Sequence, residues 1–180
     1  LGEEFVGALV ADFYGAYNAY EGVKQRCWVH LKRDMDALRE KHSGNESAVS
    51  WVDAVLDVYW RAREAALVNH SEVERCRLRT SFEAELQSLA DPYLVVKNAP
   101  QRVLAQRIDR FLGELFTFVQ YPFVPSENNA AERAIRPAVI ARKVSGGTRS
   151  AKGSRTSSVL RSLFDTWAVQ GLNTIDACRA

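Results

Sequence analysis

The sequence contains few of the residues and patterns that define several protein classes. Its three cysteines, Cys27, Cys76 and Cys178, lie far apart and do not form the framework of a disulfide-rich secreted domain. No apolar run approaches the ~20 residues that a membrane-spanning helix needs. Acidic Glu3 and Glu4 stand where a secretory signal would be basic. We therefore expect a protein of the reducing cytoplasm that does not associate with a membrane.

Motifs of several common enzyme classes are also absent. The sequence has no phosphate-binding P-loop, no glycine fingerprint of a dinucleotide site and no nucleophile elbow. Cys27-x-x-His30 supplies half of the ligands of a structural zinc site, but the other cysteines and histidines show no matching second pair. We therefore interpret Cys27 and Trp28 as core residues. His30, Arg33 and Asn128 are candidates for the lining of a functional cleft.

The two ends of the sequence look incomplete. The only methionine is Met35, and the chain begins with Leu1. At the other end, NTIDACRA predicts a capped helix that has barely begun when the chain stops. We expect the chain to be part of a longer protein.

Hydrophobic periodicity divides the chain into strand-like ends and a helical middle. The apolar run 5–12 predicts a buried strand that ends at Asp12, and the run 23–30 predicts a second short strand that leads into a helix. Three further helices are expected where apolar residues recur at helical spacing: 47–68, 72–89 and 101–119. The predicted fold class is therefore α/β at the ends, with an all-α insertion between them.

A short helix with an acidic residue at its centre is predicted in VPSENNAAERAIRP, residues 124–137. Ser126 has the side chain of an N-cap, and Glu132 lies in the middle of the predicted helix. Pro137 should end the helix or lie just beyond its end, because proline lacks the N–H that continues the helical hydrogen-bond ladder.

Three segments are predicted after this helix. Residues 138–144 are strand-like or extended, and residues 145–154 form a loop rich in Gly, Ser and basic residues. Residues 157–171 predict an amphipathic helix with Gly171 as the residue just past its end.

Two acids, Asp12 and Glu132, form the first candidate site. Asp12 follows an apolar strand, at the strand end where sheet proteins tend to place ligand groups. Mg²⁺ is commonly held by one or two protein carboxylates plus substrate phosphate oxygens, and two such ions can assist an in-line displacement at phosphorus. The alternative is that Glu132 forms a solvated helix pair with Arg136, worth about a few tenths of a kcal/mol.

The stretch from Arg133 to Phe164 carries basic residues and no Asp or Glu. Gly146, Gly147 and Gly153 within it would allow a close approach to a phosphate backbone. Such side chains would position DNA rather than read its sequence; the alternative is a solvated basic loop. The basic residues are Arg133, Arg136, Arg142, Lys143, Arg149, Lys152, Arg155 and Arg161.

Four motifs, in this order, resemble the transposases of the insertion sequence 66 family: ALVADFYGAYNAY, QRCWVHLKRDMDAL, SENNAAERAIRPAVIARKVSGG and SLFDTWAVQGLNTIDA. The resemblance covers both ends of the chain, whereas the helical middle is only generally similar. It implies a DDE transposase with a ribonuclease H-like catalytic core. Residues 1–43 would form the first part of this partial core, 44–120 a helical insertion, and 121–180 the second part with the glutamate helix, basic loop and C-terminal helix.

The resemblance also implies roles for individual residues. Asp12 would be the second acid of the catalytic triad and Glu132 the third, and both would bind Mg²⁺ or Mn²⁺. The first acid should lie on an earlier strand, upstream of Leu1, so this chain alone is expected to be inactive. Cys27-x-x-His30 is similar to a signature found between these acids in several transposase groups. The implied partners are DNA, at transposon ends and target, and further copies of the protein on that DNA in the bacterial cytoplasm.

Three functions are compatible with these features. The first is a fragment of a transposase that hydrolyses a phosphodiester at the transposon end and transfers the freed strand to target DNA. The second is a DNA-binding or regulatory remnant that keeps the basic surface without strand transfer. The third is a helical interaction domain with an incidental basic loop.

Overall fold

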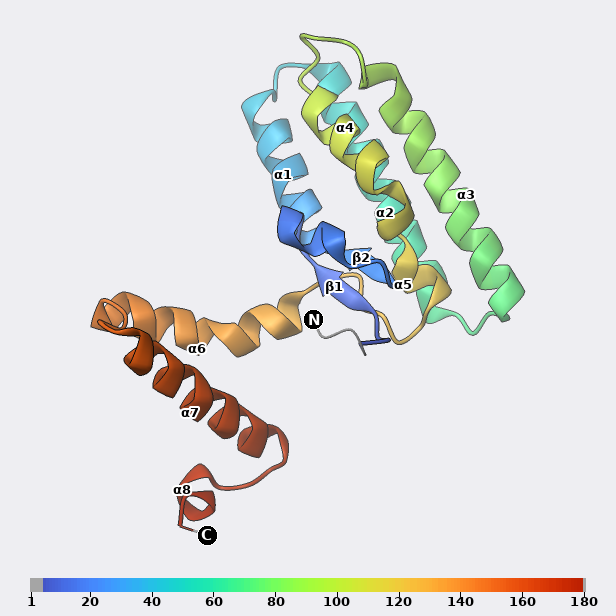
Figure 1. Ribbon diagram of the computed structural model, residues 1–180. Helices are drawn as coiled ribbons and strands as arrows, with labels where there is room; N and C mark the ends of the chain where they lie inside the picture. Colours follow the sequence, from blue (N-terminus) through green and yellow to red (C-terminus); the bar gives the residue numbers. More distant parts are fainter. Residues whose placement is uncertain (1–4, 180) are drawn as a thin grey trace. The chain divides into compact units, whose positions relative to one another are not determined.

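The computed structural model of the chain describes residues 5–179 (Figure 1). The chain divides into two compact units, residues 1–128 and residues 129–180. The hydrophobic core lies in the first unit, and the helices of the second contain no buried residue among those described. Within residues 5–179, no helix combines the length and the apolar character needed to cross a membrane.

A small parallel sheet lies at one end of the first unit (Figure 1). Strand β1, Leu9–Ala11, pairs with β2, Lys24–Arg26, and Val10 lies opposite Gln25. The 3-10 helix η1, Gly15–Ala19, lies in the connection between them. Both predicted strands are therefore present, and β1 is shorter than the predicted apolar run because the partner strand is only three residues long.

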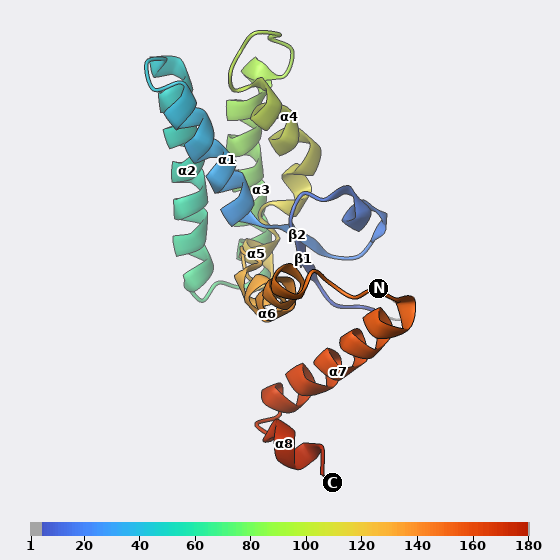
Figure 2. The same cartoon turned by 90° about the vertical axis from the view of Figure 1, so that its left-hand side faces the viewer.

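A bundle of helices forms the rest of the first unit, and the two views show its helices running beside one another (Figure 1, Figure 2). Its long helices are α1, Trp28–Lys41; α2, Glu46–Leu67; α3, Glu72–Ala90; and α4, Arg102–Phe111. The side chains of Asn45 and Ser71 cap α2 and α3 by accepting hydrogen bonds from first-turn N–H groups. The predicted helices 47–68 and 72–89 are confirmed to within a residue at each end.

The third predicted helix, 101–119, is interrupted. After α4 the chain forms a 3-10 turn, η3, Leu112–Glu114, and then a short helix, α5, Thr117–Gln120. Gly113 lies at the break, and glycine is a poor helix former. The apolar pattern continues without a gap through this region, and it therefore did not predict the break between α4 and α5.

The break makes a main-chain acceptor available to the sheet. The carbonyl of Leu115 accepts hydrogen bonds from Gln25 Nε2 at 3.0 Å and from Trp28 Nε1 at 2.6 Å. Gln25 Oε1 in turn accepts from the N–H of Phe118 at 3.0 Å. These buried polar side chains are satisfied by backbone groups, as burial requires. The hydrogen bonds made by Gln25 to Leu115 and Phe118 thus connect the helical bundle to β2.

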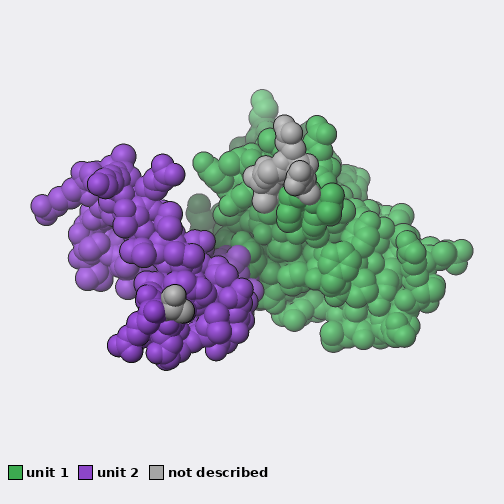
Figure 3. All heavy atoms as spheres, turned by 60° about the horizontal axis from the view of Figure 1, so that its bottom comes forward, with its two compact units in different colours: residues 1–128 green, residues 129–180 purple. Residues whose placement is uncertain are grey.

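The second unit consists of helices (purple in Figure 3). They are α6, Asn129–Ser145; α7, Ala151–Val169; and α8, Thr174–Ala177. The prediction that Pro137 ends the first of these helices is wrong, since it lies inside α6, and residues 138–144 are helical rather than extended. Proline removes one N–H but has a helix-compatible φ, so the helix continues through it with one hydrogen bond fewer.

Both ends of α7 are capped. Ser150 Oγ accepts from the N–H of Gly153 at 3.0 Å, so α7 begins within the predicted loop 145–154. At the other end, Gly171 has a φ of 73° and its N–H donates to Ala168, while the N–H of Leu172 donates to Trp167. This pair of bonds is a Schellman motif, and it confirms Gly171 as the residue just past the helix. The capped helix predicted at the C-terminal end is also confirmed as α8.

The described chain is mostly helical with a small parallel sheet. Among residues 5–179, the predicted α/β character is confined to β1 and β2. A ribonuclease H-like core stays a prediction.

Candidate functional site

Asp12 lies directly after β1 and is half-buried. Its Oδ1 accepts a hydrogen bond from the N–H of Tyr14 at 2.9 Å, which makes a local turn of the type that aspartate favours. An ionised carboxylate offers about four lone-pair sites on two oxygens. The turn therefore orients the carboxylate and leaves acceptor capacity for a cation.

The main chain of Asp12 is held by Arg26, the last residue of β2. The Arg26 side chain is 1% exposed, and its Nη1 donates to the Asp12 carbonyl at 2.8 Å. Nη2 donates to Asn18 Oδ1 at 2.7 Å, and Nε donates to Glu114 Oε2 at 2.5 Å. The guanidinium carbon also lies 4.4 Å from the centre of the Phe111 ring. Arg26 was not predicted from the sequence as a functional residue. The one sign of it in the sequence is that a charged residue lies within a short predicted strand.

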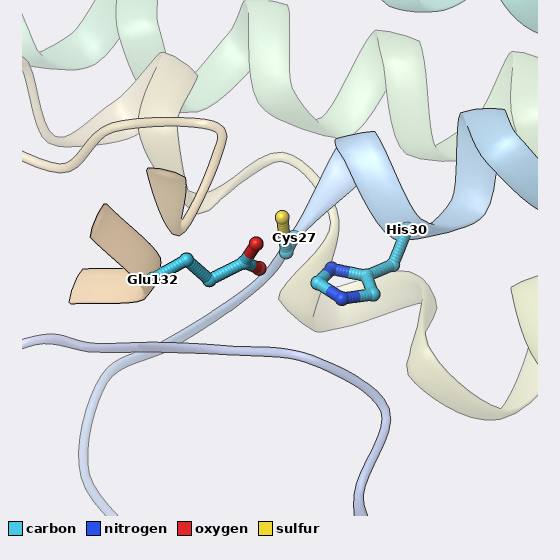
Figure 4. Close-up of side chains that lie close together, drawn as sticks. All are labelled: Cys27, His30 and Glu132. Atoms are coloured by element: carbon cyan, nitrogen blue, oxygen red, sulfur yellow. The ribbon is translucent and has the colours of Figure 1, made fainter. Parts of the chain in front are cut away.

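Glu132 lies in the first turn of α6 and is half-buried (Figure 4). A carboxylate in a first turn is stabilised by the partial positive charge of the helix N-terminus. Asp12 belongs to the first unit and Glu132 to the second. The convergence of the two carboxylates on shared metal ions therefore stays a prediction.

Cys27 comes directly before α1, and His30 lies in the first turn of that helix (Figure 4). The Cys27 and Trp28 side chains are fully buried, which confirms them as core residues. Cys27 Sγ accepts a hydrogen bond from the N–H of Asn128 at 3.2 Å, and the N–H of Trp28 donates to the Ser126 carbonyl at 3.0 Å. The segment that leads into α6 is thus fixed to the start of α1.

Ser126 does not cap α6, so the N-cap prediction is wrong. The helix begins at Asn129, three residues further along, and Ser126 is buried in the first unit. Its Oγ lies 3.4 Å from the hydroxyl of Tyr59, which stacks on Trp28 with ring centroids 4.5 Å apart. Burial raises the pKa of Tyr59 above its ordinary value, and the hydrogen bond with Ser126 opposes this only in part.

The three candidate cleft residues lie in the first unit. His30 and Arg33 are three residues apart on α1 and so share a helix face, with His30 half-buried and Arg33 exposed. Asn128 is half-buried. Their role in a cleft stays a prediction.

The basic side chains of the second unit are exposed over α6, the loop after it and the start of α7. Gly146 and Gly147 in this loop have φ of 69° and 83°, which glycine adopts readily. Arg161 differs, because it is half-buried and lies 3.7 Å from Asp165. The exposed basic residues are Arg133, Arg136, Arg142, Lys143, Arg149, Lys152 and Arg155.

Comparison with known proteins gives two matches. Residues 1–156 match the family described as Transposase IS66 family. A protein of Sinorhizobium fredii (strain NBRC 101917 / NGR234), described as uncharacterized protein y4jO, is 29% identical over 168 residues, which cover 92% of this chain and 49% of that protein. The chain thus spans about half the length of this curated relative. No solved structure matches the chain. Because the family match extends over most of the chain, the chain belongs to the IS66 family of DDE transposases.

Proposed function

We propose that this chain supplies two carboxylates, Asp12 and Glu132, to the metal-dependent centre of a DNA transposase. The observation that carries the proposal is the position of Asp12 within the family match: it directly follows a β-strand, with its carboxylate oriented by one hydrogen bond and its carbonyl by another. In the proposed reaction a water hydrolyses a phosphodiester at the transposon end. The freed 3′ hydroxyl then attacks target DNA.

The carboxylate donors suit Mg²⁺ or Mn²⁺, because hard divalent cations prefer oxygen ligands. When bound, such ions activate the attacking oxygen and stabilise charge on the leaving oxygen. Asp12 and Glu132 would hold them, and the turn with Tyr14 would keep the Asp12 carboxylate oriented. The two acids are the second and third of three in this proposal, and residues 44–120 are an insertion between the segments that carry them.

The exposed basic side chains from Arg133 to Arg155 would hold the DNA backbone. Lys and Arg side chains on α6, on the start of α7 and in the glycine-containing loop between them can contact phosphates without reading bases. The transposase would act as a multimer on DNA, with each copy presenting its own basic segment. The same basic surface supports a second candidate function, a DNA-binding protein without strand transfer.

The test uses the full-length protein that contains this chain, with Asp12→Asn and Glu132→Gln as variants. Each change removes a negative charge while keeping the size of the side chain, so we expect DNA binding near wild type and loss of strand transfer. Asp165→Asn, an exposed change on α7, is the matched control and should keep both activities.

Retained strand transfer in Glu132→Gln or Asp12→Asn would overturn the metal-ligand assignment. Wild-type protein that binds DNA but transfers no strand, with Mg²⁺ or with Mn²⁺, would favour the second candidate function. Loss of DNA binding by both variants would point to a structural role for the two acids.

A further inference from the structure

A buried guanidinium organises the chain around Asp12. Arg26 is in register with Ala11, the residue before Asp12, so its side chain starts beside the end of β1. A buried charge is costly unless its partners satisfy it. Arg26 has three such partners, the Asp12 carbonyl, Asn18 Oδ1 and Glu114 Oε2.

These three partners come from three different segments. The Asp12 carbonyl ends β1, Asn18 lies in η1, and Glu114 lies in η3 of the helical bundle. Glu114 also forms an ion pair with Lys24, which lies on β2 with Arg26; the distance from Lys24 Nζ to Glu114 Oε1 is 3.0 Å. The planar fork of Arg26 therefore joins the turn that carries Asp12 to the bundle.

We propose that Arg26 is the positioning residue of Asp12: by binding the Asp12 carbonyl, it fixes the turn from which the carboxylate reaches a divalent cation. The inference rests on the proposed function for the role of Asp12 as a metal ligand. When a residue that hydrogen-bonds and orients a metal ligand is substituted, metal affinity typically falls by about 10–100-fold. Arg26 touches neither DNA nor metal in this role, and it acts through Asp12.

A purely structural ion pair between Arg26 and Glu114 makes a different prediction. It would change overall stability and leave the Asp12 turn as it is. Arg26→Lys separates the two roles, because lysine keeps the charge but has a single head group that does not reproduce the three-pronged geometry of the guanidinium. Asn18→Ala is a milder second variant, since Asn18 is exposed and its substitution removes one hydrogen bond of Arg26.

Arg75→Lys is the matched control. Arg75 is also a buried arginine that donates to main-chain carbonyls, those of Val68, His70 and Val119, and none of these lies at Asp12. The substitution is chemically the same as Arg26→Lys. It should lower stability without affecting the Asp12 turn.

The experiment measures two quantities on the full-length protein. Hydrogen exchange reports the amide of Tyr14, which donates to the Asp12 carboxylate, in protein without metal. A Mn²⁺ titration reports the concentration at which strand transfer is half-maximal. For Arg26→Lys we expect faster exchange of the Tyr14 amide than in wild type, and an increase of about tenfold or more in the half-maximal Mn²⁺ concentration. Asn18→Ala should give smaller increases in the same direction, and Arg75→Lys should give neither.

Wild-type values in both Arg26→Lys and Asn18→Ala would overturn the proposal, and so would equal changes in Arg75→Lys. Faster exchange at Tyr14 with an unchanged Mn²⁺ requirement would also overturn it, because the turn would then not matter for metal. Should Arg26→Lys not fold, Asn18→Ala decides by the same two measurements. Failure of the proposed function is recognised separately, by strand transfer that survives Asp12→Asn.

Discussion

The backbone N–H of Asn128 donates a hydrogen bond to the sulfur of Cys27, although 101 residues separate them in sequence. Beside it, the N–H of Trp28 donates to the carbonyl of Ser126. The first N–H groups of a helix have no partner within it, and here the segment before α6 supplies an acceptor for one of them. The cysteine of the Cys27-x-x-His30 motif thus has a structural role of its own.

We expect Cys27→Ala to lower the free energy of unfolding by about 1–3 kcal/mol, because it leaves the half-buried N–H of Asn128 without its acceptor and removes a fully buried side-chain atom. Cys76→Ala is the control, since Cys76 is only partly buried on α3 and its substitution should cost about 0.5 kcal/mol or less. Denaturant unfolding followed by tryptophan fluorescence measures both. Equal effects of the two substitutions would argue against the role assigned to Cys27.

Stability should fall at alkaline pH through Tyr59. Burial raises the pKa of the folded-state phenol, so the neutral form is favoured by folding. The stabilisation is complete below the ordinary tyrosine pKa of about 10 and is lost as pH rises through the higher folded value. Tyr59→Phe should remove this part of the alkaline loss, and at neutral pH it should cost about 1 kcal/mol for the bond with Ser126.

Unfolding free energies measured from pH 8 upward check this prediction. Tyr14→Phe is the control, because Tyr14 is 66% exposed and its substitution should leave the pH dependence unchanged. If the unfolding free energy falls with rising pH equally steeply in Tyr59→Phe and in wild type, the role assigned to Tyr59 is contradicted.

Pro137→Ala should stabilise α6. Inside a helix, proline deprives the carbonyl four residues earlier, here that of Arg133, of its hydrogen-bond donor. Alanine restores the donor and is favoured over proline by about 3 kcal/mol in helix interiors. Hydrogen exchange of the α6 amides should therefore be slower in Pro137→Ala than in wild type. Ala138→Gly is the control, and it should make the same amides exchange faster because glycine disfavours a helix. Unchanged exchange in Pro137→Ala would mean that the helix depends on other contacts at this point.

Neutralising part of the basic segment should change the salt dependence of DNA binding. Removing one side chain that binds a phosphate lowers the slope of log K against log salt by about one. The triple substitution of Arg142, Lys143 and Arg149 by Ala should therefore reduce the slope by about 3 on duplex DNA, regardless of its sequence. Fluorescence anisotropy across a salt series measures it.

The control removes three exposed basic residues of the first unit: Lys41, Arg77 and Lys97. They lie outside the basic segment, so their substitution should leave the slope near wild type. Equal slopes for the two triple variants would show that only total charge matters.

Much of the helical bundle was predictable from sequence, because its signals are local. Apolar residues recur at helical spacing from Trp51 to Tyr59, and Asn45 and Ser71 provide caps at the starts of α2 and α3. The end of α7 at Gly171 was predictable for the same reason. Asp12 at the end of a strand could also be read from the chain, since an apolar run leads directly to it.

The remaining features depend on partners far away in sequence or on weak local rules. Arg26 gains its role from Asp12, Asn18 and Glu114, and the last of these is 88 residues away. Nothing near Arg26 in the sequence points to these partners. Pro137 misled the prediction because a proline disfavours a helix without forbidding it, and its cost is a single bond and local strain.

The carbonyl of Leu115 has a consequence for synthesis of the protein. It accepts from Gln25 and Trp28, which precede it by 90 and 87 residues. At translation rates of about 5–20 residues per second, these side chains emerge from the ribosome roughly 5–20 s before their acceptor. During that interval the indole of Trp28 lacks its final hydrogen-bond acceptor, and Gln25 of β2 lacks its hydrogen bonds with Leu115 and Phe118. These two buried side chains therefore reach their native hydrogen bonds only after the segment around Leu115 has been synthesised.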